Sequence, residues 1–246
     1  MLAEPNDQLR LLDLAGIDTA IAQLLHRRKT LPLHSEINTR SETRKAVTAR
    51  LVAANTALSD AQYGLEKSEK DIEPVKQRIT RNQGRLDSGE VTDPKTVAGL
   101  VDEVANLKNR LVELEDIQLD AMQTLEDATE NQQKIQAERD SGDEELRALI
   151  KQRDEQVADI DAEITKKRAE RTKLAAELPA DLIGIYEKVL QRSGMGAAQL
   201  HRGKCNGCGL ELNPAELRRI ADLAANEVVR CEECSRILIR SDESGL

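Results

Sequence analysis

The chain has 246 residues and a net charge of −9, with 33% charged residues but only 1% aromatic residues. A globule of this length normally fills its core with aromatic side chains, yet the sequence has no Trp, no Phe and only two Tyr. A composition rich in Ala, Leu, Glu, Lys, Arg and Gln is typical of long helices and coiled coils. No apolar run reaches about 18 residues, so we expect no membrane-spanning segment. The N-terminus lacks the basic head and apolar core of a secretory signal, so we expect a cytoplasmic protein.

The N-terminal part predicts two helices in succession. Residues 5–29 show helical periodicity, and Pro32 interrupts the pattern because proline cannot donate a backbone hydrogen bond. From residue 34 to 87 a row repeats every seven residues, and a second row follows each of its members after three residues. These rows are the a and d positions of a coiled coil. The a row is Ile37, Arg44, Leu51, Leu58, Leu65, Ile72, Ile79 and Leu86.

A second arm of the coiled coil is predicted for residues 94–178, after a turn at residues 88–94. Asp93 can cap the new helix, and proline suits its first turn. Folding the arms antiparallel places Leu51 opposite Ile135, with other large residues opposite small or medium ones. We therefore predict an intramolecular hairpin over residues 1–178, and a parallel dimer of extended helices is the alternative.

Two local features of the arms carry further expectations. Ser68 falls opposite Gln118, and one polar layer of this kind fixes the register of a coiled coil. The stretch Ser141-Gly-Asp143 shifts the heptad phase, which predicts local unwinding of the supercoil. The heptad rows account for the apolar residues of the rod, so we expect none of them to remain for a partner.

The C-terminal part contains all the cysteines of the chain, arranged as two C-x-x-C pairs, Cys205 with Cys208 and Cys231 with Cys234. Each pair allows a tight turn to aim two thiolates at one point, and two such turns complete a tetrahedron around Zn²⁺. Two disulfides would require an oxidising compartment, and a redox C-x-x-C would require a βαβ context that the sequence lacks. Four thiolates leave no open position for water, so we predict one structural zinc ion.

The remaining elements of residues 179–246 predict a small α+β domain around this metal. Pro179 ends the second arm, and a short amphipathic helix containing Leu182 and Tyr186 follows. Strands are expected at residues 197–204, 227–230 and 237–240, and Asn213 with Pro214 marks the start of another helix. The predicted fold is therefore mainly α, with a long antiparallel coiled-coil hairpin and a small C-terminal α+β zinc ribbon preceded by a short helix.

This combination resembles a bacterial family of long coiled-coil hairpin proteins with a C-terminal C4-type zinc ribbon. The resemblance rests on Leu182 to Tyr186, on the two C-x-x-C pairs, on Leu212-x-Pro214, and on Arg236-Ile-Leu238 after the last cysteine. Ser235 and Ile239 depart from the glycine and the aromatic residue that the family often has at these positions. The resemblance implies a nucleic-acid-binding protein or an adaptor.

The sequence bears on three classes of function. An enzyme is not expected, because no P-loop, nucleophile elbow or paired carboxylates in a pocket-forming context are present. We expect a protein-binding adaptor that acts through the ribbon as a monomer or weak homodimer, with Met195, Ile237 and Ile239 available to the partner. Direct binding of RNA or DNA is the alternative, although no aromatic residue lies between the cysteines to stack on a base. The candidate binding cations are Arg202, Lys204, Arg218, Arg219, Arg230, Arg236 and Arg240, with Arg192 nearby.

Overall fold

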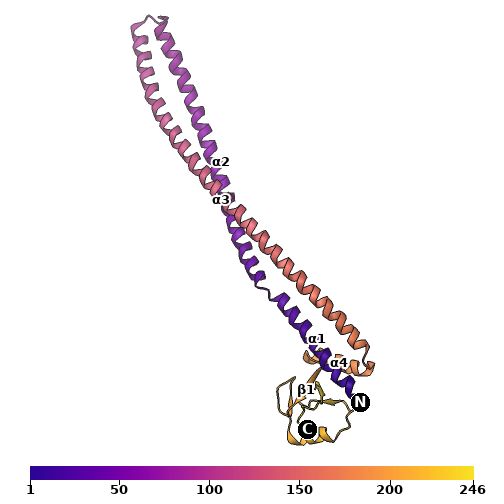
Figure 1. Cartoon of the computed structure of the whole chain (residues 1–246). Helices are drawn as coiled ribbons and strands as arrows, with labels where there is room; N and C mark the ends of the chain where they lie inside the picture. The colour runs from indigo at the N-terminus through magenta and orange to yellow at the C-terminus, as the bar shows by residue number, and fades with distance from the viewer. The chain divides into compact units, whose positions relative to one another are not determined.

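The computed structural model describes all 246 residues, and the chain forms two compact units (Figure 1). Unit 1 consists of Met1–His34 and Lys151–Leu246, and unit 2 consists of Ser35–Ile150. None of the helices combines the length and the apolar character that crossing a bilayer requires. In chain order the elements are α1 (Pro5–Lys29), α2 (Pro32–Asp87), α3 (Pro94–Ala176), α4 (Ala180–Ser193), β1 (Ala197–His201), β2 (Lys204–Cys205), α5 (Pro214–Asp222), β3 (Val229–Arg230) and β4 (Ile237–Ile239).

Unit 2 is the antiparallel hairpin that the heptads predict. The arms of α2 and α3 lie side by side up to the turn that joins them (Figure 1). Every a and d position in this hairpin from Val47 to Ile135 is buried or half-buried. Leu51 and Ile135 share one buried cluster. Nearer the turn, Lys76 Nζ lies 3.0 Å from Glu115 Oε1 on the flank of the same seam, so the predicted register holds along the hairpin.

The turn between the arms begins where Gly89 adopts a positive φ of 71°. α3 then starts at Pro94, and Asp93 Oδ2 accepts a hydrogen bond from the Thr96 amide at 2.9 Å. This bond satisfies one of the amides that a helix leaves unpaired in its first turn. The hydroxyl and amide of Thr96 hold the pKa of Asp93 below its usual range.

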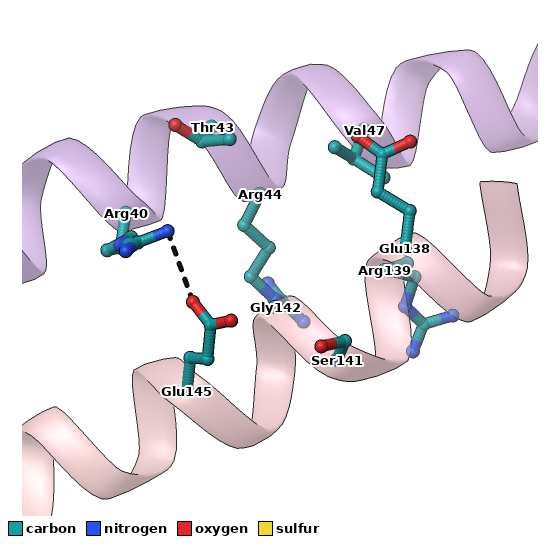
Figure 2. A pocket seen from close by; sticks show the side chains of 9 residues that line it. All are labelled: Arg40, Thr43, Arg44, Val47, Glu138, Arg139, Ser141, Gly142 and Glu145. Carbon is teal, nitrogen blue, oxygen red and sulfur yellow. Dashed lines mark ion pairs between the residues drawn. The ribbon is translucent and has the colours of Figure 1, made fainter.

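α3 continues without a break through Gly142, although the heptad phase shifts there. Asp143 is only 9% exposed, and it accepts a hydrogen bond from Arg44 Nε and forms an ion pair with Arg139 at 3.6 Å. Arg40 bonds Glu145 at 3.1 Å one turn further along (Figure 2). The hydrogen bond from Arg44 is the main reason why the pKa of Asp143 is lowered. A polar layer around the buried Asp143 thus replaces the apolar layer that the interrupted heptad cannot supply.

Unit 1 is built around a core that joins distant parts of the chain. Leu11 and Leu14 of α1 are fully buried with Tyr186 of α4 and with Ile237 and Ile239 of β4. Because α1 and α4 pack against the strands, residues 1–34 belong to the same compact unit as the ribbon. The hairpin range 1–178 expected from sequence therefore differs from the extent of the compact units.

The same core corrects the expectation that Ile237 and Ile239 are free for a partner. Both side chains are 0% exposed, since β4 is an inner strand of the sheet with α1 against it. Met195 is half-buried and packs against the second core cluster, which contains Leu200 and Ile220. Contacts with α1 and α4 therefore bury Ile237 and Ile239, and the second core cluster covers much of Met195.

The sheet has the strand order β2-β1-β4-β3. β1 runs parallel to β4 with Ala197 opposite Ile237, and the other two pairings are antiparallel. The N-terminal residues pair with the segment just before β3, because the Val228 amide donates to Met1 O at 3.0 Å and the Ala3 amide donates to Asn226 O at 2.8 Å. Nothing in the sequence pattern predicted that the first residues pair with the ribbon.

Candidate metal centre

The first knuckle is a tight turn that follows β2. The Gly209 amide donates to Cys205 O at 2.7 Å, and Gly209 has a φ of 76°, which glycine adopts at little cost. At Gly207 a Cβ would lie 2.7 Å from Arg236 Cδ and 2.9 Å from Ala198 Cβ. Both glycines are therefore required by the turn, one for its backbone angle and the other for the space beside it.

The second knuckle has the same construction. The Ser235 amide donates to Cys231 O at 2.8 Å, and Ser235 has a φ of 62°. Ser235 thus occupies the position that corresponds to Gly209, one residue after the second cysteine of its pair. A left-handed conformation costs a residue with a Cβ about 1–3 kcal/mol, so glycine would adopt the backbone angle of Ser235 at lower cost.

The two knuckles bring the four sulfur atoms together. The ligand atoms all lie within 4.8 Å of one another, with Cys205 Sγ 3.8 Å from Cys234 Sγ and Cys208 Sγ 4.0 Å from Cys231 Sγ. A tetrahedron with zinc–sulfur bonds of about 2.3 Å has edges of about 3.8 Å. The donor set and its spacing therefore fit one tetrahedral Zn²⁺.

Burial and hydrogen bonds act in opposite directions on the pKa values of the thiols. Burial raises the pKa of Cys205 and Cys231. For Cys234 burial acts in the same direction, but hydrogen bonds to the sulfur, led by the Arg236 amide, lower its pKa to about 7. Cys234 therefore has a lower pKa than Cys205 and Cys231, and a bound cation stabilises thiolates.

Comparisons with known proteins match both parts of this architecture. Residues 14–194 match the model of the CT398-like coiled coil hairpin domain, and residues 204–238 match the model of the C4-type zinc ribbon domain. The chain belongs to the CT398-like hairpin family. This assignment confirms the expected family, the fold class and one structural zinc ion held by the four cysteines.

Relatives of the CT398-like chain cover nearly its full length. The protein Rv2229c of Mycobacterium tuberculosis is 32% identical over 244 residues, which are 98% of each chain. The protein ML1638 of Mycobacterium leprae is 28% identical over 227 residues, which are 91% of this chain and 96% of that protein. A solved structure from Mycobacterium smegmatis has a TM-score of 0.86 at 29% identity and covers 98% of this chain and 100% of its own. CT398 from Chlamydia trachomatis has a TM-score of 0.66 at 17% identity and covers 96% and 98%, so it shows the fold alone.

Two of the candidate cations serve the ribbon itself. Arg236 donates to Gly207 O and to Ser193 O, each at 2.9 Å, and so ties the first knuckle to the end of α4. Arg240 donates to five backbone carbonyls in the last turn of α5 and in the segment that follows it. These acceptors are Ile220, Leu223, Ala224, Ala225 and Glu227, at 2.7–3.3 Å. Arg236, through its two terminal guanidinium nitrogens, and Arg240 thus serve the fold, because irregular backbone near the zinc site needs partners for its carbonyls.

The other candidate cations divide into paired and unpaired side chains. Lys204 lies 2.9 Å from Glu211, and Arg219 lies 3.4 Å from Glu232. The exposed cations without an ion pair in the structure are Arg202, Arg218 and Arg230.

Arg230 lines a hollow of about 380 Å³ beside the second knuckle, together with Lys188 and Arg192 of α4. Cys234, Ser235 and a single carboxylate, Glu233, form part of its wall. None of the three cations has an ion-pair partner. Sequence reasoning included Arg230 and Arg192 but missed Lys188, since only the packing of α4 against the ribbon brings it near Arg230.

A second hollow, of about 260 Å³, lies between the arms of unit 2 beside Gly142 (Figure 2). Arg40, Arg44 and Arg139 line it, but Asp143 and Glu145 already pair with these arginines. The arrangement balances its own charges and contains no nucleophile with an adjacent base, so it indicates a structural layer of the hairpin.

Proposed function

We propose that this CT398-like chain is a non-enzymatic adaptor whose zinc ribbon and α4 bind an acidic segment of a partner protein. The observation that supports this proposal is the hollow beside Cys234, where Lys188, Arg192 and Arg230 gather without ion-pair partners. Unpaired cations on a fixed surface attract and orient an acidic ligand. Zinc contributes by fixing the second knuckle, which carries the wall of the hollow.

A protein partner is favoured over nucleic acid for three reasons. Lys204 and Arg219 are engaged by carboxylates, so the cations do not form a continuous track for a phosphate backbone. No aromatic side chain lines the hollow to stack on a base. The sequence carries a net charge of −9, which opposes the approach of a long polyanion more strongly than that of a short acidic segment.

A catalytic role finds no support in the metal centre. Four thiolates complete the coordination of zinc, so no position is left for a water molecule or a substrate. Tyr186 and the half-buried Asp18 of unit 1 bond to each other, and Arg171 donates to Asp18. Zinc in this chain therefore acts as a structural staple.

The test measures binding of two fluorescent probes, an acidic peptide and a single-stranded RNA oligonucleotide, to the full zinc-loaded chain. We expect Arg192→Glu with Arg230→Glu to reduce binding of the peptide at least about tenfold while the zinc content stays constant. Arg218→Glu with Arg202→Glu is the matched control, because these cations are also exposed and unpaired but lie outside the hollow. Arg236 is not substituted, because its loss would disturb the first knuckle.

The result would contradict the proposal if both double variants weakened binding equally or if only the RNA bound. If RNA binding falls steeply with salt and depends on the hollow, the hollow is a site for phosphate groups and not for an acidic peptide. Deletion of residues 70–110, near the turn of the hairpin, is expected to leave peptide binding unchanged. Loss of binding on that deletion would place the working surface on unit 2.

A further inference from the structure

The outer flank of α3 carries an apolar stripe that the heptad seam does not explain. Val101, Val112, Leu119 and Met122 expose between 50% and 63% of their surface, and Ala98 and Ala105 are exposed between them. They occupy positions b and e of the heptads whose a and d positions pack against α2. This corrects the expectation that the rod leaves no apolar residues for a partner.

Positions b and e form a second seam along the same helix. In a helix of 3.6 residues per turn, e lies about 40° from a, and b lies about 60° further around. α3 can therefore contact α2 with one face and a further helix with the adjacent face. Charged residues at these b and e positions would not disturb the packing of α3 against α2. Apolar residues there therefore indicate contact with a further surface.

We infer that the stripe is the interface for a second copy of this chain, packed antiparallel about a two-fold axis near Arg110 and Leu111. In this register Leu119 of one copy faces Val101 of the other, and Ala98 faces Met122. Each of these contacts occurs twice, as an isologous interface requires. A large side chain faces a smaller one in both cases, which suits packing of knobs into holes.

The two charged residues within the stripe also favour a second copy of this chain as the partner. Lys108 and Glu115 occupy e positions on either side of the proposed axis, and Lys108 is exposed and has no ion-pair partner in the chain. Glu115 bonds Lys76 at 3.0 Å and retains 44% of its side-chain exposure. Antiparallel pairing brings Lys108 of each copy within reach of Glu115 of the other, whereas parallel pairing would place like charges together.

The first experiment follows the oligomeric state of the full zinc-loaded chain by sedimentation over a range of concentrations. We expect a monomer–dimer equilibrium whose dissociation constant rises at least about tenfold in Val112→Glu with Leu119→Glu. Val52→Glu is the matched control, since Val52 is 62% exposed on α2 and lies outside the stripe. Lys108→Glu or Glu115→Lys alone weakens the dimer, and the two changes together restore it. A chain that stays monomeric at every concentration overturns the inference, and so does a dimer that the stripe variants leave intact.

The second experiment tests the direction of packing with introduced cysteines and a short thiol crosslinker, while zinc protects the native cysteines. A mixture of Val101→Cys chains and Leu119→Cys chains is expected to give a covalent dimer, and each variant alone is expected to remain uncrosslinked. The chain without an introduced cysteine controls for reaction of the ribbon thiols. Efficient crosslinking of each variant alone would demonstrate parallel packing and overturn the inference.

Discussion

The Tyr186 hydroxyl donates a hydrogen bond of 2.7 Å to Asp18 Oδ2, although the two residues are 168 positions apart. The bond joins α4 to α1 inside the core of unit 1, where Tyr186 is completely buried. Arg171 of α3 donates to both Asp18 and Glu187. The partly buried carboxylate is thus paired by two donors from different helices, which is the condition under which burial of a charge is tolerated.

The first prediction concerns alkaline pH. Burial, aided by the bond to Asp18, raises the pKa of Tyr186. The folded chain therefore holds this proton more tightly than the unfolded chain, in which tyrosine has a pKa of about 10. The stabilising effect is fully present below that pKa and is lost as pH rises above it. We expect the free energy of unfolding of unit 1 to fall above about pH 10, and to fall less in Tyr186→Phe.

Denaturant unfolding at a series of pH values measures this effect. Tyr63→Phe is the matched control, because Tyr63 is 69% exposed on α2 and lacks a buried partner. In that variant Tyr186 is the only tyrosine, so its ionisation can be followed directly by ultraviolet absorbance. Ionisation of Tyr186 in the folded chain near the ordinary tyrosine pKa would contradict the prediction.

The second prediction concerns removal of the metal. Cys208→Ser takes away one of the four ligands, so the chain should lose stoichiometric zinc and the ribbon should lose its protection from hydrogen exchange. Small domains seldom have enough core to fold without such a staple. The overall helicity should remain high, because α2 and most of α3 lie in unit 2 or pair with other helices. Retention of exchange protection in residues 197–240 by the variant would refute a structural role of zinc.

The parts of this architecture that could be predicted are those that local sequence patterns determine. Periodic side chains specify the arms, because each a or d position needs only the neighbouring helix to become buried. The register could be derived as well, since folding the arms about the predicted turn places Leu51 opposite Ile135, and the two are observed in one cluster. The zinc ligands were predictable because a C-x-x-C turn brings two sulfur atoms together almost regardless of context.

Contacts between distant segments could not be predicted in the same way. Asp18 appears in the sequence as an ordinary polar residue of an amphipathic helix, and only packing makes it the acceptor for Tyr186. Arg240 appears as a cation after a strand, yet it donates to carbonyls that lie 13 to 20 positions earlier. The exposed b/e stripe of α3 was overlooked because the a/d rows had already explained the helix.

The third prediction separates structural cations from free ones. Arg240→Gln removes most of the donors that bind the carbonyls in and after the last turn of α5. A hydrogen bond to a charged group contributes about 1.5–3 kcal/mol to stability. We expect the free energy of ribbon unfolding to fall by about 2 kcal/mol. Arg218→Gln should change it little, because Arg218 is exposed and unpaired on α5. Equal stability of the two variants would show that the carbonyl contacts of Arg240 contribute nothing.

The fourth prediction tests the hairpin in solution. Cysteines introduced at Ile79 and Leu107 should crosslink within one chain, because the register that joins Leu51 to Ile135 also places these two positions opposite each other. A pair at Ile79 and Leu114 is the control, since Leu114 lies two turns further along α3. The products can be resolved by mass and by denaturing electrophoresis with the ribbon zinc in place. Crosslinks found only between chains would indicate a dimer of extended helices.

The fifth prediction compares two glycines with opposite surroundings. A Cβ at Gly196 would lie 2.4 Å from the ring of Tyr186, and that ring is held by its bond to Asp18 and by the core around it. Gly196→Ala should therefore displace the ring and destabilise unit 1 by about 1–3 kcal/mol, the usual cost of overpacking. Gly142 lies inside α3 with no atom within 4 Å of a Cβ. Gly142→Ala should stabilise the hairpin by up to about 1 kcal/mol, because alanine is the better helix former. Thermal unfolding followed by circular dichroism should show opposite shifts for the two variants, and shifts of the same sign would mean that the ring of Tyr186 can move aside at little cost.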